Sequence, residues 1–351
     1  MDKTTIAIDL AKSVFEMAVA DENGKILERK RLGRSQFIRF FDNRYFDLVV
    51  MEACGSSHYW GRWFTERGMK VALLPPHYVR AYVRRNKTDR ADATAMLEAA
   101  KAPDIQPVGV KSVEQQAIQS LHRIREQWMS TRTSRINALR GLCREFGIVA
   151  PLGAKRGMAE LVAQVTDQTS RVPDLLRYSL ERLITEIRTI EENLRRIEYE
   201  LACCASQSPV CERLRRIPGV GLLTATAMLS AVSDIHSFRT GRRFASWLGL
   251  TPREYSSGGV RRLGSISKRG DRYLRVMLVH GARAIVYTAN AAKRAGRPLD
   301  ALRRWALELR ARVGHNKAVV AVANKMARII WATWYREQDY DFRGALPEAS
   351  V

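Results

Sequence analysis

The sequence has no long uncharged hydrophobic run. A membrane-spanning helix needs roughly 20 mostly apolar residues, and we find no basic amphipathic segment that would anchor the chain to a membrane surface. Cysteine is also scarce. The chain has five cysteines, an odd number, and they form no C-x-x-C pair. Met1 leads directly into a strand-like segment, so no signal peptide is expected. We expect a cytoplasmic protein without a membrane partner, whose thiols stay reduced.

Acidic residues are few relative to basic ones. The 351 residues include 59 Lys and Arg against 36 Asp and Glu, a formal net charge of +23. A chain with this much positive charge along its length predicts a polyanionic partner, and nucleic acid is the leading candidate. Hydrophobic residues make up 46% of the chain, which favours two or three packed domains over disorder.

The N-terminal part contains a recognisable order of strands and helices. Three strand-like segments come first, with a hairpin-turn signal at Asn23-Gly24. Three meandering strands followed by strand, helix, strand and helix are the order of a ribonuclease-H-like (RuvC-like) α/β domain. The expected strands are residues 4–11, 14–21, 25–32, 47–53 and 69–75, and the helix between the last two is 56–67.

The middle of the chain is predicted to be all-α. Seven apolar residues follow one another at alternating steps of three and four, which is the seam of a coiled coil over three heptads. The seam belongs either to a long helix packed inside its own domain or to a dimer contact. A helix over Ser112–Gly147 is the expected antiparallel partner within the chain. The seam residues are Leu180, Leu183, Ile187, Ile190, Leu194, Ile197 and Leu201.

A Pro-Gly-Val-Gly turn between two apolar helices lies in Leu214–Val232. It is typical of a helix-hairpin-helix, whose exposed backbone N–H groups hold a phosphate, although a plain helical connection has the same pattern. From Glu212 to Arg275 the chain has 13 Lys and Arg against 4 Asp and Glu, a net charge of +9. The expected nucleic-acid contacts of the turn are Arg215, Arg216, Gly219 and Gly221.

Four carboxylates stand out by position. Asp9 and Glu52 end two strands of the predicted sheet, and Asp89 and Asp92 are three residues apart at the start of a helix. A carboxylate in a hydrophobic run costs free energy unless it is paired or bound to metal, and residues three apart share a helix face. The four side chains are therefore expected to converge and to bind Mg²⁺. Separately, each acid has a plainer interpretation as a turn or cap residue.

The stretch "TPREYSSGGVRR" from Thr251 to Arg262 interrupts the helical part with serines and glycines. Viewed alone it is typical of a linker, but the basic segment around it makes it a candidate nucleophile loop. The glycines at 258 and 259 would let the backbone approach DNA closely. Side chains expected to bind phosphates here are Arg253, Arg261, Arg262, Lys268 and Arg269.

Six motifs then resemble one family in order. They are "AIDLAK", "MEACG", "NKTDRADA", "RIPGVG", "WLGLTPREYSSGG" and "ISKRGDRYLRVML", and together they span roughly Ala7 to Leu278. The chain is similar to the DEDD-type insertion-sequence transposases, which include the Piv-type DNA invertases. The resemblance implies a RuvC-like domain at 1–108, a helical coiled-coil linker at 109–205 and a mostly helical transposase domain at 206–351.

The resemblance also implies roles for particular residues. The DEDD set falls on Asp9, Glu52, Asp89 and Asp92, and the catalytic serine falls on Ser257. It further implies site-specific recombination of donor and target DNA, a structured guide RNA in some members, and homodimers or homotetramers whose domains form composite sites.

Nucleophilic attack by Ser257 on a phosphodiester, with a phosphoserine intermediate, is the leading hypothesis. Ser256 is one residue out of register, and Tyr255 is a rival nucleophile whose ring could instead pack under the loop. His236 and His280 are interpreted as structural, since no Ser-His-Asp spacing is evident. Two other functions stay open. One is a metal-dependent nuclease or junction resolvase with a structural serine, and the other is a non-enzymatic nucleic-acid-binding protein.

Overall fold

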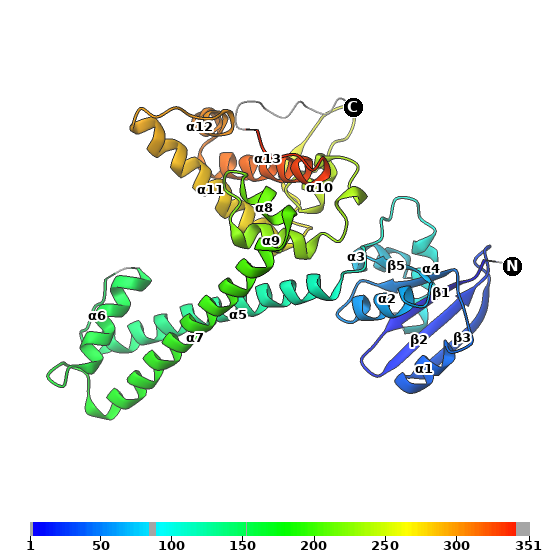
Figure 1. The fold of residues 1–351 in the computed structure, drawn as a ribbon, viewed down its shortest axis with the longest axis horizontal. Coiled ribbons are helices and arrows are strands. Elements are labelled where there is room, and N and C mark those ends of the chain that lie inside the picture. The colour runs from blue at the N-terminus through cyan, green and yellow to red at the C-terminus, as the bar shows by residue number, and fades with distance from the viewer. Residues whose placement is uncertain (1–2, 84–88, 152, 342–351) are drawn as a thin grey trace. The chain divides into compact units, whose positions relative to one another are not determined.

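The computed structural model describes residues 3–83, 89–151 and 153–341, and the chain folds into two compact units (Figure 1). Unit 1 comprises Met1–Gln116 together with Val232–Asp234, and unit 2 comprises Ala117–Ala231 and Ile235–Val351. Within the described part of the chain, no helix combines the length and the apolar character needed to cross a membrane.

Unit 1 is built on a mixed five-stranded sheet in the order β3-β2-β1-β4-β5. The first three strands pair antiparallel, and β4 runs parallel to both β1 and β5. Each predicted strand forms, and the predicted turn at Asn23-Gly24 joins β2 to β3 with Gly24 at a φ of 85°. The strands are β1 (Thr5–Leu10), β2 (Val14–Ala20), β3 (Ile26–Gly33), β4 (Leu48–Glu52) and β5 (Lys70–Leu74).

The two faces of this sheet bury different side chains because residues alternate along a strand. One face carries a large aromatic cluster in which the rings of Phe15 and Phe37 stack at 4.2 Å, with Trp60 edge-on to both. The other face carries alanines such as Ala7 and Ala18, which let a helix approach closely. The aromatic face is covered by α1 (Arg34–Phe40) and α2 (Ser57–Thr65), and the alanine face by α4 (Asp89–Ala100), with α3 (Pro76–Val79) beside it.

A long antiparallel helical pair, teal and green in Figure 1, lies almost wholly in unit 2. The helices are α5 (Val113–Glu145) and α7 (Asp174–Ser206), with α6 (Ala154–Thr166) between them in sequence. Arginines of α5 pair with glutamates of α7, and the partner numbers fall along α7 as they rise along α5. These pairs are Arg125–Glu198 at 2.7 Å, Arg132–Glu191 at 2.5 Å and Arg135–Glu186 at 3.0 Å.

The predicted seam of α7 is buried by the chain itself. Leu180 and Ile187 pack with Ile136 and Leu139 of α5, and Ile197 packs with Ile118. The expected partner over Ser112–Gly147 is therefore confirmed, and the seam packs inside its own unit. Leu183 is only partly buried, whereas its neighbour Ile184 is buried. A straight helix of 3.6 residues per turn drifts from a strict seven-residue repeat, which explains the exchange.

The rest of unit 2 is a group of helices around α11 and α13 that also carries a two-stranded hairpin. A close backbone contact joins the turn before α9 to the middle of α11. A Cβ on Gly219, which has a φ of 79°, would lie 2.7 Å from the carbonyl oxygen of Gly281, and a Cβ on Gly281 would overlap that of Gly219. The elements are α8 (Pro209–Arg215), α9 (Leu222–Ala231), α10 (Gly241–Trp247), β6 (Pro252–Glu254), β7 (Leu263–Ile266), α11 (Arg272–Arg294), α12 (Ala301–Val313) and α13 (His315–Tyr335).

This contact predicts that Gly281→Ala destabilises the protein. The methyl group has no room against the Gly219 backbone, and overpacking of this kind costs about 1–3 kcal/mol. Gly141→Ala is the matched control, because Gly141 is an exposed position of α5 with open space around it. There the same change is expected to stabilise the helix by about 0.5–1 kcal/mol. Thermal unfolding of both variants measures the difference, and equal shifts in Tm would contradict the packing argument.

Candidate active site

The serine loop is a tight turn at the tip of the β6–β7 hairpin. The N–H of Val260 donates to the carbonyl oxygen of Ser257 at 3.1 Å, and Gly258 and Gly259 between them have φ values of 57° and 76°. Two central residues with positive φ define a type I′ turn, whose twist matches that of the flanking strands. The glycines are therefore required by the turn, and the loop is an ordered hairpin end.

The two adjacent serines are in different environments. Ser256 Oγ donates to Glu254 at 2.7 Å and accepts the backbone N–H of Arg262 at 3.1 Å, so its hydroxyl helps to hold the hairpin together. Ser257 is exposed, and its hydroxyl makes no hydrogen bond to the described residues. The ring of Tyr255 is 64% exposed and lies beside Gly264. Of the two serine hydroxyls, that of Ser257 lies at the turn and is free of hydrogen bonds to the described residues.

The base of the hairpin is fixed to the start of α11. One guanidinium nitrogen of Arg275 donates to the carbonyl oxygens of Leu248 at 3.1 Å and Gly270 at 2.7 Å, which joins the segment before β6 to the segment after β7. Backbone bonds add to this, because the N–H of Lys268, a residue with a φ of 56°, donates to Gly249. The hairpin therefore stands on a rigid base.

The predicted phosphate-binding side chains surround this hairpin, and all five are exposed. Arg261 pairs with Glu254 at 3.3 Å, and Arg253 donates to the carbonyl oxygen of Ser267 at 3.3 Å. The other three make no side-chain ion pair with the described residues, which leaves their charges available to an anion. The set is Arg253, Arg261, Arg262, Lys268 and Arg269.

Two of the predicted acids lie side by side at one edge of the unit 1 sheet. Ile8 of β1 is the register partner of Met51 of β4, so Asp9 and Glu52 are the next residues on neighbouring parallel strands. Strand alternation places both on the alanine face that α4 covers. Asp92 is half-buried in the first turn of α4. The side chain of Asp89, like residues 86–88 at the start of the "NKTDRADA" motif, lies outside the described part.

One further carboxylate on this face of the sheet was not predicted from the sequence. Glu16 of β2 is the antiparallel register partner of Asp9 and lies on the same face. The sequence signal that could have identified Glu16 was its position in the second strand of the predicted sheet, opposite Asp9. Among the side chains that the structure describes, no group of three His, Cys, Asp or Glu is close enough to hold a metal ion. The donors are nevertheless all carboxylates gathered on one face, a chemistry that fits a hard divalent cation.

The helix-hairpin-helix turn has a structural role at Gly219, which contacts the α11 backbone. Gly221 is exposed at the start of α9, and Arg215 is exposed at the end of α8. Arg216 pairs with Asp339, and Arg213 lies 4.0 Å from the same carboxylate. The predicted nucleic-acid contact at this turn stays a prediction for Arg215, Arg216, Gly219 and Gly221.

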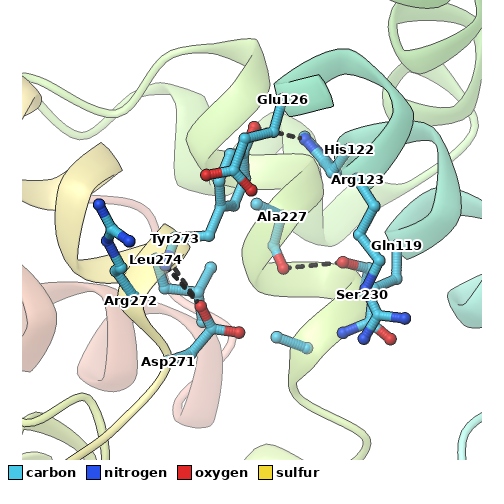
Figure 2. A pocket seen from close by; sticks show the side chains of 11 residues that line it. Gln119, His122, Arg123, Glu126, Ala227, Ser230, Asp271, Arg272, Tyr273 and Leu274 are labelled. Atoms are coloured by element: carbon cyan, nitrogen blue, oxygen red, sulfur yellow. Dashed lines mark hydrogen bonds between the residues drawn. The ribbon is translucent and has the colours of Figure 1, made fainter. Parts of the chain in front are cut away.

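A buried histidine also links α5 to the start of α11 (Figure 2). His122 Nδ1 is 3.0 Å from the hydroxyl of Tyr273, and Nε2 is 3.0 Å from Thr226 Oγ1. The Thr226 hydroxyl donates to the carbonyl oxygen of Leu222 at 2.8 Å, so it accepts from Nε2–H, and Tyr273 donates to Nδ1. The neutral imidazole satisfies both neighbours at the wall of a cavity of about 310 Å³.

Burial lowers the pKa of His122 from 6.5 to about 4, and the Arg125 guanidinium adds to the shift. His122 was not among the residues predicted to be functional. Its signal was a lone histidine four residues after Ile118, on the buried face of a helix.

Two family models match the chain, one in its N-terminal part and one in its C-terminal part. The family described as "Transposase IS116/IS110/IS902 family" matches residues 211–296, and a DEDD-type profile of IS110 elements, described as "Transposase", matches residues 6–147. A "Probable family 20 transposase" of Pseudomonas aeruginosa is 41% identical over 97% of this chain and 99% of its own length. The "Transposase for insertion sequence element IS1111A" of Coxiella burnetii is 38% identical over 97% and 92%. The "Pilin gene-inverting protein" of Moraxella bovis is 24% identical over 79% and 81%.

The buried imidazole predicts a pH dependence of stability. His122 is neutral in the folded protein down to about pH 4, whereas in the unfolded chain it takes up a proton near pH 6.5. Its contribution is present above pH 6.5 and is lost as the pH falls toward 4, by about 2–3 kcal/mol at pH 4.5. His122→Gln keeps a donor and an acceptor but does not titrate. Denaturant unfolding at pH 7 and 4.5 should show a smaller loss in the variant, and equal losses would refute the assignment.

Proposed function

The chain belongs to the IS116/IS110/IS902 family of transposases, and we propose that it cuts and rejoins DNA through a covalent bond to Ser257. Transposases of this family recombine DNA, and the relatives named as transposases cover nearly the whole chain. The similarity to pilin gene-inverting proteins fits site-specific recombination as the shared chemistry.

The observation that carries the proposal is the difference between the two serines. The Ser256 hydroxyl is occupied within the hairpin, whereas Ser257 is exposed at a type I′ turn between basic side chains. A nucleophile needs an accessible oxygen and nearby groups that stabilise the developing charge. Arg262, Lys268 and Arg269 are suited to that role because no carboxylate among the described residues pairs with them.

The Ser257 oxygen attacks phosphorus, the bond from phosphorus to the departing DNA oxygen breaks, and the serine proton passes through solvent to that oxygen. The DNA end is held as a phosphoserine, which conserves the bond for rejoining. A hydroxyl of the incoming DNA end then attacks the same phosphorus and restores the serine. The type I′ turn presents the hydroxyl at a rigid tip, so little reorganisation is needed.

A divalent metal is implied by membership of the DEDD family. We propose that it is Mg²⁺ and that Asp9, Glu52, Asp89 and Asp92 hold it. Support comes from the shared sheet face of Asp9 and Glu52, with Asp92 in the first turn of the helix that covers it. When bound, Mg²⁺ would lower the pKa of a hydroxyl and offset charge on the phosphoryl oxygens.

The finer architecture belongs to the same proposal. The strand order β3-β2-β1-β4-β5, with three antiparallel strands followed by two parallel ones, supports a ribonuclease-H-like (RuvC-like) sheet. The division into a DEDD domain at 1–108, a linker at 109–205 and a transposase domain at 206–351 is likewise proposed. Because the acids belong to unit 1 and the serine hairpin to unit 2, we propose that domains of different subunits of a homodimer or homotetramer complete one site.

A structured guide RNA is the last proposed partner, beside donor and target DNA. The net charge of +23 suits a polyanionic partner such as RNA as well as DNA, and an RNA that pairs with both DNAs would supply the sequence specificity. The exposed basic side chains of the hairpin are suited to phosphate backbones and read no base sequence by themselves.

The serine assignment predicts opposite outcomes for two neighbouring substitutions. Ser257→Ala should abolish the covalent protein–DNA adduct, at least about 100-fold, because it removes the nucleophile. Ser256→Ala should retain adduct formation within about tenfold, because it removes only hydrogen bonds that hold the hairpin. The measurement is denaturing gel electrophoresis of the full chain with a nicked DNA substrate, followed by phosphoamino-acid analysis.

Three outcomes would redirect this assignment. An adduct that persists in Ser257→Ala and disappears in Ser256→Ala shifts the register by one residue. Phosphotyrosine in the trapped product points to Tyr255. DNA cleavage that survives Ser257→Ala without any adduct favours a metal-dependent nuclease or junction resolvase, in which the serine is structural.

The acids are tested by Asp9→Asn. This change removes one charge from the proposed metal site and should lower the rate of DNA cleavage at least about 100-fold while DNA binding stays within about twofold. Asp42→Asn is the control, because Asp42 is an exposed carboxylate of unit 1 away from that sheet face. Cleavage is measured as a function of Mg²⁺ concentration. Unchanged cleavage by Asp9→Asn would remove the metal role of this residue.

A further inference from the structure

The helix α11 has an unusual charge distribution. Its 23 residues include no Asp or Glu, although they include four arginines and one lysine. Three of the arginines occupy the first, middle and last positions of the helix at intervals of eleven residues: Arg272, Arg283 and Arg294. Eleven residues make three turns of an α-helix to within about 20°, so these side chains are aligned on one side over roughly 33 Å.

That side of α11 is exposed to solvent. Between the arginines lie Val276, His280 and Tyr287, which fall within the same narrow arc, and the Tyr287 ring is 76% exposed. We call these six residues the α11 stripe: Arg272, Val276, His280, Arg283, Tyr287 and Arg294, all of them exposed.

The packing of α11 keeps the α11 stripe exposed to solvent. The opposite side of α11 is buried through Leu278, Gly281, Ala282 and Ile285, and the backbone contact of Gly281 with Gly219 fixes the rotation of the helix. None of the three stripe arginines pairs with a carboxylate among the described residues. Three aligned guanidinium groups without carboxylate partners leave a row of positive charge available to an anion.

The chemistry of the stripe matches an extended polyanion. A row of charges about 33 Å long is close to one turn of a DNA duplex, which carries a phosphate charge every 1.7 Å or so of its axis. The stripe begins three residues after Arg269, at the base of the serine hairpin. A duplex whose phosphodiester meets Ser257 therefore has a basic surface leading away from the reaction site.

We propose that the α11 stripe binds the phosphate backbone of duplex DNA beside the site of strand exchange, independently of its sequence. This inference rests on the proposed function for the position of the DNA, and it adds a second contact surface to the hairpin. The arginines supply ionic contacts to phosphates, and His280 and Tyr287 supply hydrogen bonds to the same backbone.

The test is the salt dependence of DNA affinity. The full chain and a variant carrying Arg272→Gln, Arg283→Gln and Arg294→Gln are titrated with a fluorescent 30-base-pair duplex at several KCl concentrations, and anisotropy gives each Kd. Loss of three phosphate contacts should reduce the slope of log affinity against log salt by about two to three. The affinity at moderate salt should fall about ten- to a hundredfold.

A matched control separates a local surface from net charge. The triple variant Arg182→Gln, Arg188→Gln and Arg195→Gln removes the same charge from exposed positions of α7 and should leave the slope unchanged. Equal loss in both triple variants, or none in the α11 variant, overturns the proposal. So does a loss that affects an RNA duplex of the same sequence and spares the DNA, or reduced thermal stability that accounts for the loss.

The two proposals fail in different ways. If Ser257 forms no adduct in the parent protein, the proposed chemistry is wrong, while the α11 slope is still measured by binding alone. If the α11 variant keeps the parent slope but the parent forms the adduct, the chemistry stands and the stripe is not a DNA contact.

Discussion

The guanidinium of Arg275 is the interaction on which the presentation of the serine depends. It donates to carbonyl oxygens of two segments that flank the hairpin, and Asp271 beside it caps α11 through the N–H groups of Tyr273 and Leu274. The hairpin itself has only short strands and an exposed surface, so it has no core of its own. Its orientation is therefore set by α11. That helix is fixed by the Gly219–Gly281 contact and by the hydrogen bond between Tyr273 and His122.

The orientation of the hairpin and the direction of the arginines on α11 therefore depend on the same packing of this helix. A helix whose buried side is locked by a glycine-to-glycine contact has a defined rotation, and its exposed side then has a defined direction as well. The hairpin at its beginning and the arginines along its exposed side are consequently parts of a single rigid body. Rigid support of this kind is what a reacting group needs if it is to meet phosphorus with little reorganisation.

Much of this could be predicted from residue patterns, and the limits have physical reasons. The five strands and the α5–α7 pair were predictable because buried apolar residues repeat with the period of their element. Ser256 and Ser257 could not be separated, since adjacent residues share a sequence environment and differ only in the hydrogen bonds of the folded turn. The packing of Gly219 against Gly281 could not be predicted, because the two residues are far apart in the chain. Glu16 and His122 were missed because their significance comes from the residues opposite them.

The return of the chain to unit 1 has a consequence for dividing the protein into fragments. Val232–Asp234 belongs to unit 1, where the carbonyl oxygen of Val232 accepts the side-chain amide of Gln115 at 3.0 Å and Ser233 fills the space beside Gly109. A fragment that ends after Gln116 would lack this piece and would expose the surface that it covers. The boundary between the two units therefore cannot be placed at a single position in the sequence. A faithful isolated unit 1 needs the three-residue segment restored, for example by a linker that carries it back.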